Sequence, residues 1–131
     1  MAKHILVIDA VPHSRFVVVS ALRKAGYEVS ESGDQVEALS MILNTQEKGM
    51  PFDLLCADIR MPGMTGLELI CELERRRVSI PIIAISNYVN RELVTELVRN
   101  CCSDLLVRPF EPQELLQRAG EVLERYEKGF L

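Results

Sequence analysis

Short apolar runs alternate with segments of helical period along the chain, and this alternation limits the folds open to it. Five runs have the length and composition of strands: 5–8, 27–29, 52–57, 81–85 and 105–107. Apolar residues recur at helical spacing over about residues 13–25, 35–44, 66–76, 91–101 and 112–127. Strict alternation of strands and helices predicts an α/β fold with a parallel sheet and helices on both faces.

The last helical segment shows the pattern most clearly. Leu115, Ala119, Val122 and Tyr126 recur at spacings of four, three and four residues, which places them on one side of a helix. Pro112 stands at its first turn, where the missing N–H of proline costs no hydrogen bond. This segment is therefore predicted to pack one apolar face against the sheet.

Composition indicates one globular domain. The chain has 131 residues, of which 48% are hydrophobic and 26% charged. We expect the domain to span residues 1–128, with 129–131 as a tail or the start of a linker. No apolar run approaches the roughly 20 residues that cross a bilayer, and no signal peptide is apparent, so a cytoplasmic location without membrane contact is expected. A net charge of -4 argues against direct nucleic-acid binding.

Four cysteines do not form a recognisable metal site. They show no CxxC spacing and have no nearby histidine that would complete a zinc site. We therefore expect reduced thiols, mostly buried, at Cys56, Cys71, Cys101 and Cys102.

Chemically active side chains follow four of the apolar runs. In an open parallel sheet, ligands bind outside the carboxyl ends of the strands. The residues one past each run are Asp9, Asp58, Ser86 and Arg108. A carboxylate there can serve as metal ligand, base or nucleophile, and a hydroxyl and a permanent cation can both contact a phosphoryl group. Each residue alone has an ordinary interpretation as a turn, a helix cap or a surface ion pair, but together they predict a site.

These residues and their surroundings resemble the receiver domains of two-component response regulators, over essentially the whole chain. The motifs are "DIRMPGMTG" from Asp58, with its Pro62 and Gly66, "PIIAIS" ending at Ser86, "VRPF" containing Arg108, and "FEPQEL" before the last helix. The resemblance implies a flavodoxin-like (βα)5 fold, with a doubly wound, five-stranded parallel sheet of order 2-1-3-4-5.

The resemblance also implies a function. Asp58 would accept a phosphoryl group from a histidine kinase or phosphotransfer protein, with Mg2+ neutralising the developing charge. Ser86 and Arg108, the latter followed by Pro109, would contact that group. The change would reach a face read by a downstream protein or a fused output domain, and a homodimer fits the family. Apart from self-phosphorylation by small phosphodonors and slow self-dephosphorylation, no enzyme activity is implied.

Several positions depart from the family pattern. The implied Mg2+ ligands are Asp9, Asp58 and the backbone carbonyl of Arg60, but Ala10 replaces the second acid of the usual pair, which weakens the site. Arg108 replaces the family's lysine.

The usual site, with three carboxylates, one lysine and Mg2+, has a formal charge of zero. In this chain the formal charges of two carboxylates, Asp9 and Asp58, and two guanidinium groups, Arg60 and Arg108, also sum to zero. We therefore hypothesise that the arginines partly replace the metal. The sequence supports two orientations of the Arg60 side chain, toward the pocket or toward solvent, about equally.

Leu105 stands where many receivers carry a switching aromatic residue, so a less switch-like output is expected. We expect phosphoryl acceptance on Asp58, with a degenerate, phosphorylation-independent interaction module as the alternative. An aspartate-dependent phosphohydrolase would need a second acid at position 60, which is arginine. A nucleotide or flavin module would need a glycine-rich phosphate cradle, which "DAVPHS" after the first run lacks.

Overall fold

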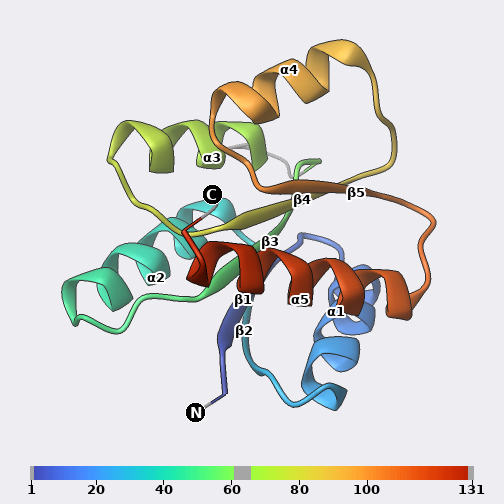
Figure 1. Ribbon diagram of the computed structural model, residues 1–131, viewed down its shortest axis with the longest axis horizontal. Helices are drawn as coiled ribbons and strands as arrows, with labels where there is room; N and C mark the ends of the chain where they lie inside the picture. The colour runs from blue at the N-terminus through green and yellow to red at the C-terminus, as the bar shows by residue number, and fades with distance from the viewer. Residues whose placement is uncertain (1, 61–65, 130–131) are drawn as a thin grey trace.

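The predicted strands pair side by side in one parallel sheet, as Figure 1 shows for the computed structural model. The structure describes residues 2–60 and 66–129. Within them the strand order is β2-β1-β3-β4-β5, which confirms the flavodoxin-like α/β fold predicted from the sequence. The strands are β1 (His4–Ile8), β2 (Glu28–Ser32), β3 (Leu54–Asp58), β4 (Ile82–Ser86) and β5 (Asp104–Val107).

A helix follows each strand along the described chain. The helices are α1 (Pro12–Lys24), α2 (Gln35–Glu47), α3 (Gly66–Arg75), α4 (Arg91–Arg99) and α5 (Pro112–Glu127). Pro112 is the first residue of α5, as predicted, and Asp34 and Asn90 cap α2 and α4 with their side chains. None of the helices in residues 2–60 and 66–129 is long and apolar enough to cross a membrane.

The edge strand β2 differs most from its predicted range. It covers Glu28–Ser32 rather than 27–29, and its sequence EVSES alternates instead of forming a continuous apolar run. Every residue of β2 nevertheless pairs with β1, from His4 opposite Glu28 to Ile8 opposite Ser32. Main-chain pairing therefore extends this strand beyond the part that hydrophobicity alone indicates.

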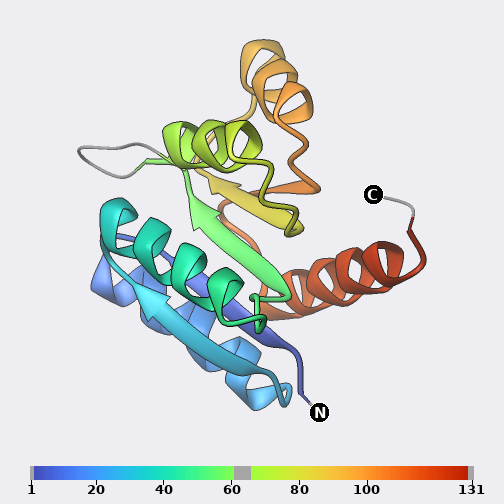
Figure 2. The same ribbon diagram turned by 90° about the vertical axis from the view of Figure 1, so that its left-hand side faces the viewer.

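Alternate residues of β1 point to opposite faces of the sheet. Leu6 and Ile8 belong to the core cluster that α2, α3 and α4 cover, whereas Ile5 and Val7 belong to the cluster that α1 and α5 cover. Figure 2 shows α1 and α2 on either side of the sheet. The chain is thus a three-layer structure with two apolar cores.

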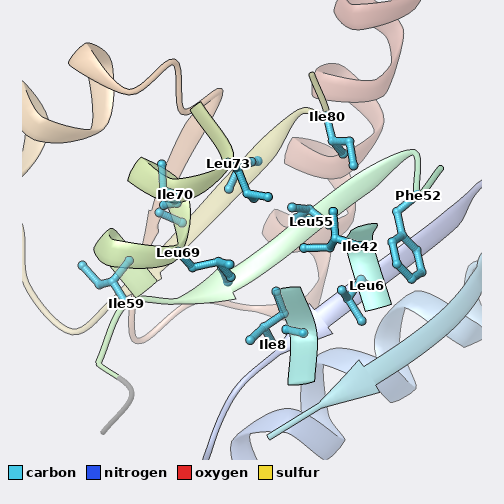
Figure 3. Packing of buried hydrophobic residues seen from close by; sticks show 14 of the residues in the cluster. Leu6, Ile8, Ile42, Phe52, Leu55, Ile59, Leu69, Ile70, Leu73 and Ile80 are labelled. Carbon is cyan, nitrogen blue, oxygen red and sulfur yellow. The ribbon is translucent and has the colours of Figure 1, made fainter. Parts of the chain in front are cut away.

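Large aliphatic side chains anchor the middle strands to α3, as Figure 3 shows. Leu6, Ile8 and Leu55 from the sheet belong to the same cluster as Leu69 and Leu73 from α3, and none of the five is more than 2% exposed. Burying each such side chain contributes about 1.5–3 kcal/mol relative to leaving it exposed. This packing holds the end of β3, where Asp58 stands, in a fixed place.

The carboxyl ends of the parallel strands lie along one edge of the sheet, toward which the arrowheads of β2, β3 and β4 point in Figure 2. Four predicted site residues are found there: Asp9 directly after β1, Asp58 and Ser86 as the last residues of β3 and β4, and Arg108 directly after β5. The topology therefore gathers residues up to 99 positions apart in the sequence.

All four cysteines are free thiols. Cys56 is buried in the sheet, and burial raises the pKa of its thiol to about 12. Cys71 and Cys102 are half-buried, and Cys101 is exposed. The expectation of mostly buried thiols is therefore wrong for Cys101, because it lies in the exposed turn after α4 rather than within an apolar element.

Candidate functional site

Two carboxylates lie buried at the carboxyl edge of the sheet. Asp9 is 2% exposed and Asp58 is 1% exposed. The backbone N–H of Asp9 donates to the carbonyl of Ser32, and its Oδ1 accepts a hydrogen bond of 2.9 Å from the N–H of Val11. These contacts fix Asp9 between β1 and the start of α1. Buried carboxylates in neighbouring strands repel each other unless cations or hydrogen-bond donors lie between them.

Arg60 supplies the first of those cations. Its Nε lies 3.2 Å from Oδ1 of Asp58, and its Nη2 lies 2.8 Å from Oδ2. The backbone N–H of Arg60 also donates to Oδ1, at 2.8 Å. This is the two-point geometry in which a planar guanidinium matches a carboxylate. The Arg60 side chain therefore faces the pocket, which decides between the two orientations that the sequence left open.

Arg108 supplies the second cation and contacts both acids. Its Nη2 lies 3.1 Å from Oδ2 of Asp58 and 3.3 Å from Oδ2 of Asp9. The same nitrogen donates to the hydroxyl of Ser14 at 2.8 Å, and Nη1 reaches Oδ1 of Asn87 at 3.4 Å. One guanidinium group therefore connects the ends of β1, β3 and β4 with the first turn of α1.

The charge state of Asp58 follows from these contacts. Burial by itself would raise the pKa of the Asp58 carboxyl, but the hydrogen bonds from Arg60 and the positive charges of Arg108 and Arg60 outweigh burial and lower the pKa. Asp58 is thus a carboxylate at neutral pH. Donors that stabilise the carboxylate also make its oxygens weaker nucleophiles.

Ser86 is fully buried at the end of β4. Its hydroxyl donates to the carbonyl of Tyr88 at 2.7 Å and accepts from the N–H of Tyr88 at 3.1 Å. The hydroxyl is therefore engaged in the turn that follows β4. The sequence placed Ser86 at this edge but did not predict this local hydrogen bonding.

Two other predicted positions lie on β5 and just beyond it. Pro109 follows Arg108 through a cis peptide bond. Leu105 lies within β5, half-buried, and packs against the core cluster beneath α2, α3 and α4. Leu105 is therefore an aliphatic core neighbour at the position where the resemblance expects a switching aromatic.

Gly66 allows a close backbone approach at the start of α3. A Cβ atom at this position would lie 2.4 Å from Cα of Ile59 and 2.7 Å from the carbonyl oxygen of Asp58. Any side chain there would push the strand end that carries Asp58. This explains the glycine of the "DIRMPGMTG" motif, whereas Pro62 of the same motif lies outside the described residues.

The sequence did not predict three further contacts of the site. Ser14 accepts from Arg108, Arg15 donates from Nη1 to the backbone carbonyl of Asp9 at 2.7 Å, and Gln35 donates to the carbonyl of Asp58 at 3.5 Å. Ser14 and Arg15 stand in the first turn of the helix after β1, at the carboxyl edge, and that position is a signal that would have drawn attention to them.

The donor set of the pocket does not fit Mg2+. This ion prefers nearly octahedral coordination by oxygen atoms and keeps several waters. Position 10 offers only a methyl group, and both acids of the pocket are engaged by guanidinium nitrogens. Among residues 2–60 and 66–129, no group of three or more His, Cys, Asp or Glu side chains is arranged to hold a metal. An entering cation would also meet the charges of Arg60 and Arg108.

Relatives with curated descriptions are similar to this chain in sequence. The transcriptional regulatory protein AruR of Pseudomonas aeruginosa is 32% identical over 126 residues, which make up 95% of this chain and 51% of AruR. The chemotaxis protein CheY of Thermotoga maritima is 28% identical over 123 residues, covering 93% of this chain and 98% of CheY. This chain thus spans about half of the first relative and nearly all of the second.

Solved structures share the fold. The chemotaxis protein CheY4 of Vibrio cholerae superposes with a TM-score of 0.83 at 29% identity, covering 93% of this chain and 99% of CheY4. A CheY-like receiver domain protein of Methanospirillum hungatei gives a TM-score of 0.88 at 26% identity, covering 98% and 99% of the two chains. The family model described as the response regulator receiver domain, a signalling domain rather than a classical enzyme, matches residues 5–120. The chain therefore belongs to the response regulator receiver domain family.

Proposed function

We propose that this receiver domain, over residues 1–128, is a signalling module that binds its protein partners without phosphorylation of Asp58. One observation carries the proposal: guanidinium nitrogens of Arg60 and Arg108 contact the carboxylate oxygens of Asp58. A carboxylate that attacks phosphorus must present a free oxygen in line with the leaving group. In this pocket that approach meets hydrogen-bonded arginines.

Charge balance supports the same proposal. Asp9 and Asp58 are matched one for one by Arg60 and Arg108, so the pocket is formally neutral without a metal. A phosphoryl group on a carboxylate would bring a charge of about -1.5 to -2 in place of -1. Receiver domains in general use Mg2+ to neutralise that charge, but the donors here do not fit the ion. The additional negative charge would therefore be poorly compensated.

The proposed partners are proteins. The family implies a histidine kinase or phosphotransfer protein on the input side and a downstream protein or fused output domain on the other, and a homodimer is a further expectation. We propose that such contacts occur in the cytoplasm, do not require Mg2+, and depend on the resting shape of the pocket edge. Neither a membrane nor direct nucleic-acid contact is part of this proposal.

Phosphoryl acceptance on Asp58 is the second candidate, and a specific observation favours it. Asp58 is ionised at the end of β3, with Arg108 in contact and Ser86 ending the adjacent strand. The Arg60 side chain is 36% exposed, so it has solvent into which it can turn. An oxygen of Asp58 would then attack phosphorus of acetyl phosphate, form a new O–P bond and release acetate with the electron pair of the broken bond.

Intact mass spectrometry after incubation with acetyl phosphate separates the two candidates. The protein is treated with and without Mg2+, next to an Asp58→Asn variant, and far-UV circular dichroism shows that each sample is folded. We expect no phosphoryl adduct on the wild type. An adduct that forms on the wild type and is absent from Asp58→Asn would overturn the proposal and establish the phosphoacceptor function.

A further inference from the structure

A single nitrogen of Arg108 bridges the two buried acids. Nη2 lies 3.1 Å from the Asp58 carboxylate and 3.3 Å from the Asp9 carboxylate. These acids belong to neighbouring strands, and their negative charges repel each other in a buried setting. A bridging cation removes that repulsion, and here a protein side chain takes this position.

Arg60 adds a second cation on the outer side of Asp58. Its Nε and Nη2 address the two carboxylate oxygens separately, at 3.2 and 2.8 Å. A lysine ammonium is a point charge and cannot make both contacts in this planar geometry. Together the two guanidinium groups supply two positive charges, the same formal charge as one divalent cation.

Ala10 fits this arrangement because it adds no negative charge. It is half-buried and packs against the apolar cluster beneath α2, α3 and α4. An acid at position 10 would leave three carboxylates facing two guanidinium groups, a formal excess of one negative charge. Neutrality therefore links position 10 to positions 60 and 108.

We infer that Arg60 and Arg108 take the place of a divalent cation, and that Ala10, Arg60 and Arg108 form one energetically coupled set. The folded pocket then needs no Mg2+ and binds none in the millimolar range. The inference deepens the proposed function and rests on its view of the pocket as unphosphorylated, but it concerns metal binding and has its own readout.

The first test is a metal titration of the full chain. The sequence has no tryptophan, so isothermal calorimetry with Mg2+ and electron paramagnetic resonance of Mn2+ replace the quenching of tryptophan fluorescence. We expect no saturable binding up to about 10 mM and no change in the thermal unfolding midpoint at that concentration, because a ligand that binds only the folded state raises the midpoint. Saturable Mg2+ binding with a dissociation constant below about 10 mM would overturn the inference.

The second test rebuilds a metal site. Ala10→Asp restores an acid, and Arg60→Met removes the outer cation while keeping an unbranched side chain in place of the aliphatic part of arginine. We expect the double variant Ala10→Asp/Arg60→Met to bind Mn2+ at least about tenfold more tightly than either single variant, since each change alone leaves part of the obstacle in place. A folded double variant that gains nothing over Ala10→Asp alone would show that Arg60 does not occupy the place of the metal.

Arg15 offers a matched control. It is also an arginine next to Asp9, but its Nη1 contacts the backbone carbonyl rather than a carboxylate. Ala10→Asp/Arg15→Met should therefore not reproduce the gain, and equal gains in both double variants would contradict the assignment to Arg60. Circular dichroism shows that each variant is folded. The two failures are distinguishable by their readouts. A phosphoryl adduct on Asp58 without saturable metal binding would overturn only the proposed function, whereas saturable metal binding without an adduct would overturn only this inference.

Discussion

The guanidinium group of Arg60 and the carboxylate of Asp58 form a two-point contact, with Nε 3.2 Å from Oδ1 and Nη2 2.8 Å from Oδ2. The two residues are only two positions apart, so the contact is built into the start of the loop after β3. It explains why a buried acid at this strand end stays ionised, and it covers the oxygens that a phosphoacceptor would use.

Removing the Arg60 side chain should raise the pKa of Asp58. In Arg60→Met the side-chain hydrogen bonds and the nearby charge are lost, while burial, which raises the pKa, remains. Arg60→Lys should give an intermediate value, because an ammonium keeps the charge without the two-point geometry. Carbon-detected NMR titration of the aspartate carboxyl groups measures the shift. An Asp58 pKa that is the same in wild type and Arg60→Met would contradict the role given to this pair.

The same shift predicts how stability depends on pH. The folded pKa of Asp58 lies below its ordinary value of 3.8, so its ionised form stabilises the folded state above that pH. This stabilisation decreases as the pH falls through the folded pKa. The free energy of unfolding of the wild type, relative to that of Asp58→Asn, should therefore decrease as the pH is lowered from about 5 through 3.8 and below.

Denaturant unfolding at a series of pH values measures this difference. The comparison is repeated in the Arg60→Met background, where the folded pKa moves back toward the unfolded one and the pH dependence of the difference should weaken. If the difference in free energy of unfolding between wild type and Asp58→Asn stays constant on acidification, Asp58 has the same pKa in the folded and the unfolded state.

A side chain at position 66 should destabilise the fold. The Cβ atom of Gly66→Ala would lie 2.4 Å from Cα of Ile59, a backbone atom that can move only with the strand end. We expect a loss of about 1–3 kcal/mol, the usual cost of overpacking. Gly120→Ala on α5 is the matched control, because the added methyl group would meet nothing within 4 Å beyond the helix's own backbone and its chain neighbours. Because alanine favours helix over glycine by roughly 0.5–1 kcal/mol, Gly120→Ala should instead raise the free energy of unfolding.

Thermal and denaturant unfolding of both glycine variants measure the change in free energy of unfolding relative to wild type. The two substitutions are chemically identical, so opposite signs isolate the close approach at Gly66 from general effects of alanine. Equal effects of the two substitutions on the free energy of unfolding would mean that β3 and α3 separate easily.

The positions of the site residues could be predicted because topology alone determines them. Once the alternation of strands and helices indicates a parallel sheet, Asp9, Asp58, Ser86 and Arg108 must come to its carboxyl edge. The direction of the Arg60 side chain could not be predicted. It depends on a balance between solvation and pairing with Asp58 that the spacing of residues does not reveal.

Other contacts could not be predicted from the sequence because they join elements that are distant along the chain or depend on local turns. Ser14 and Arg108 are 94 residues apart in the sequence, and they meet only because β1 and β5 belong to one sheet. The hydroxyl of Ser86 turns to Tyr88 through backbone geometry that composition does not encode. The full range of β2 likewise depended on pairing with β1 and not on its own hydrophobicity.

Gln35 provides a last prediction, because it is 1% exposed and its side chain contacts the backbone of Asp58. Its Nε2 donates a long hydrogen bond of 3.5 Å to the Asp58 carbonyl, and within the part of the chain that the structure describes its buried Oε1 has no hydrogen-bond partner. A buried, unsatisfied carbonyl oxygen destabilises the folded state. Gln35→Met keeps the length of the side chain and removes both polar atoms, so the free energy of unfolding should stay unchanged or rise by up to about 1 kcal/mol.

Gln35→Ala separates packing from polarity in this test. It removes the same polar atoms but leaves a cavity next to the end of β3, and the lost packing should reduce the free energy of unfolding relative to Gln35→Met. Denaturant unfolding of the two variants measures both effects. A loss of stability in Gln35→Met as large as that in Gln35→Ala would mean that the amide of Gln35 stabilises the Asp58 strand end through hydrogen bonds rather than through its volume.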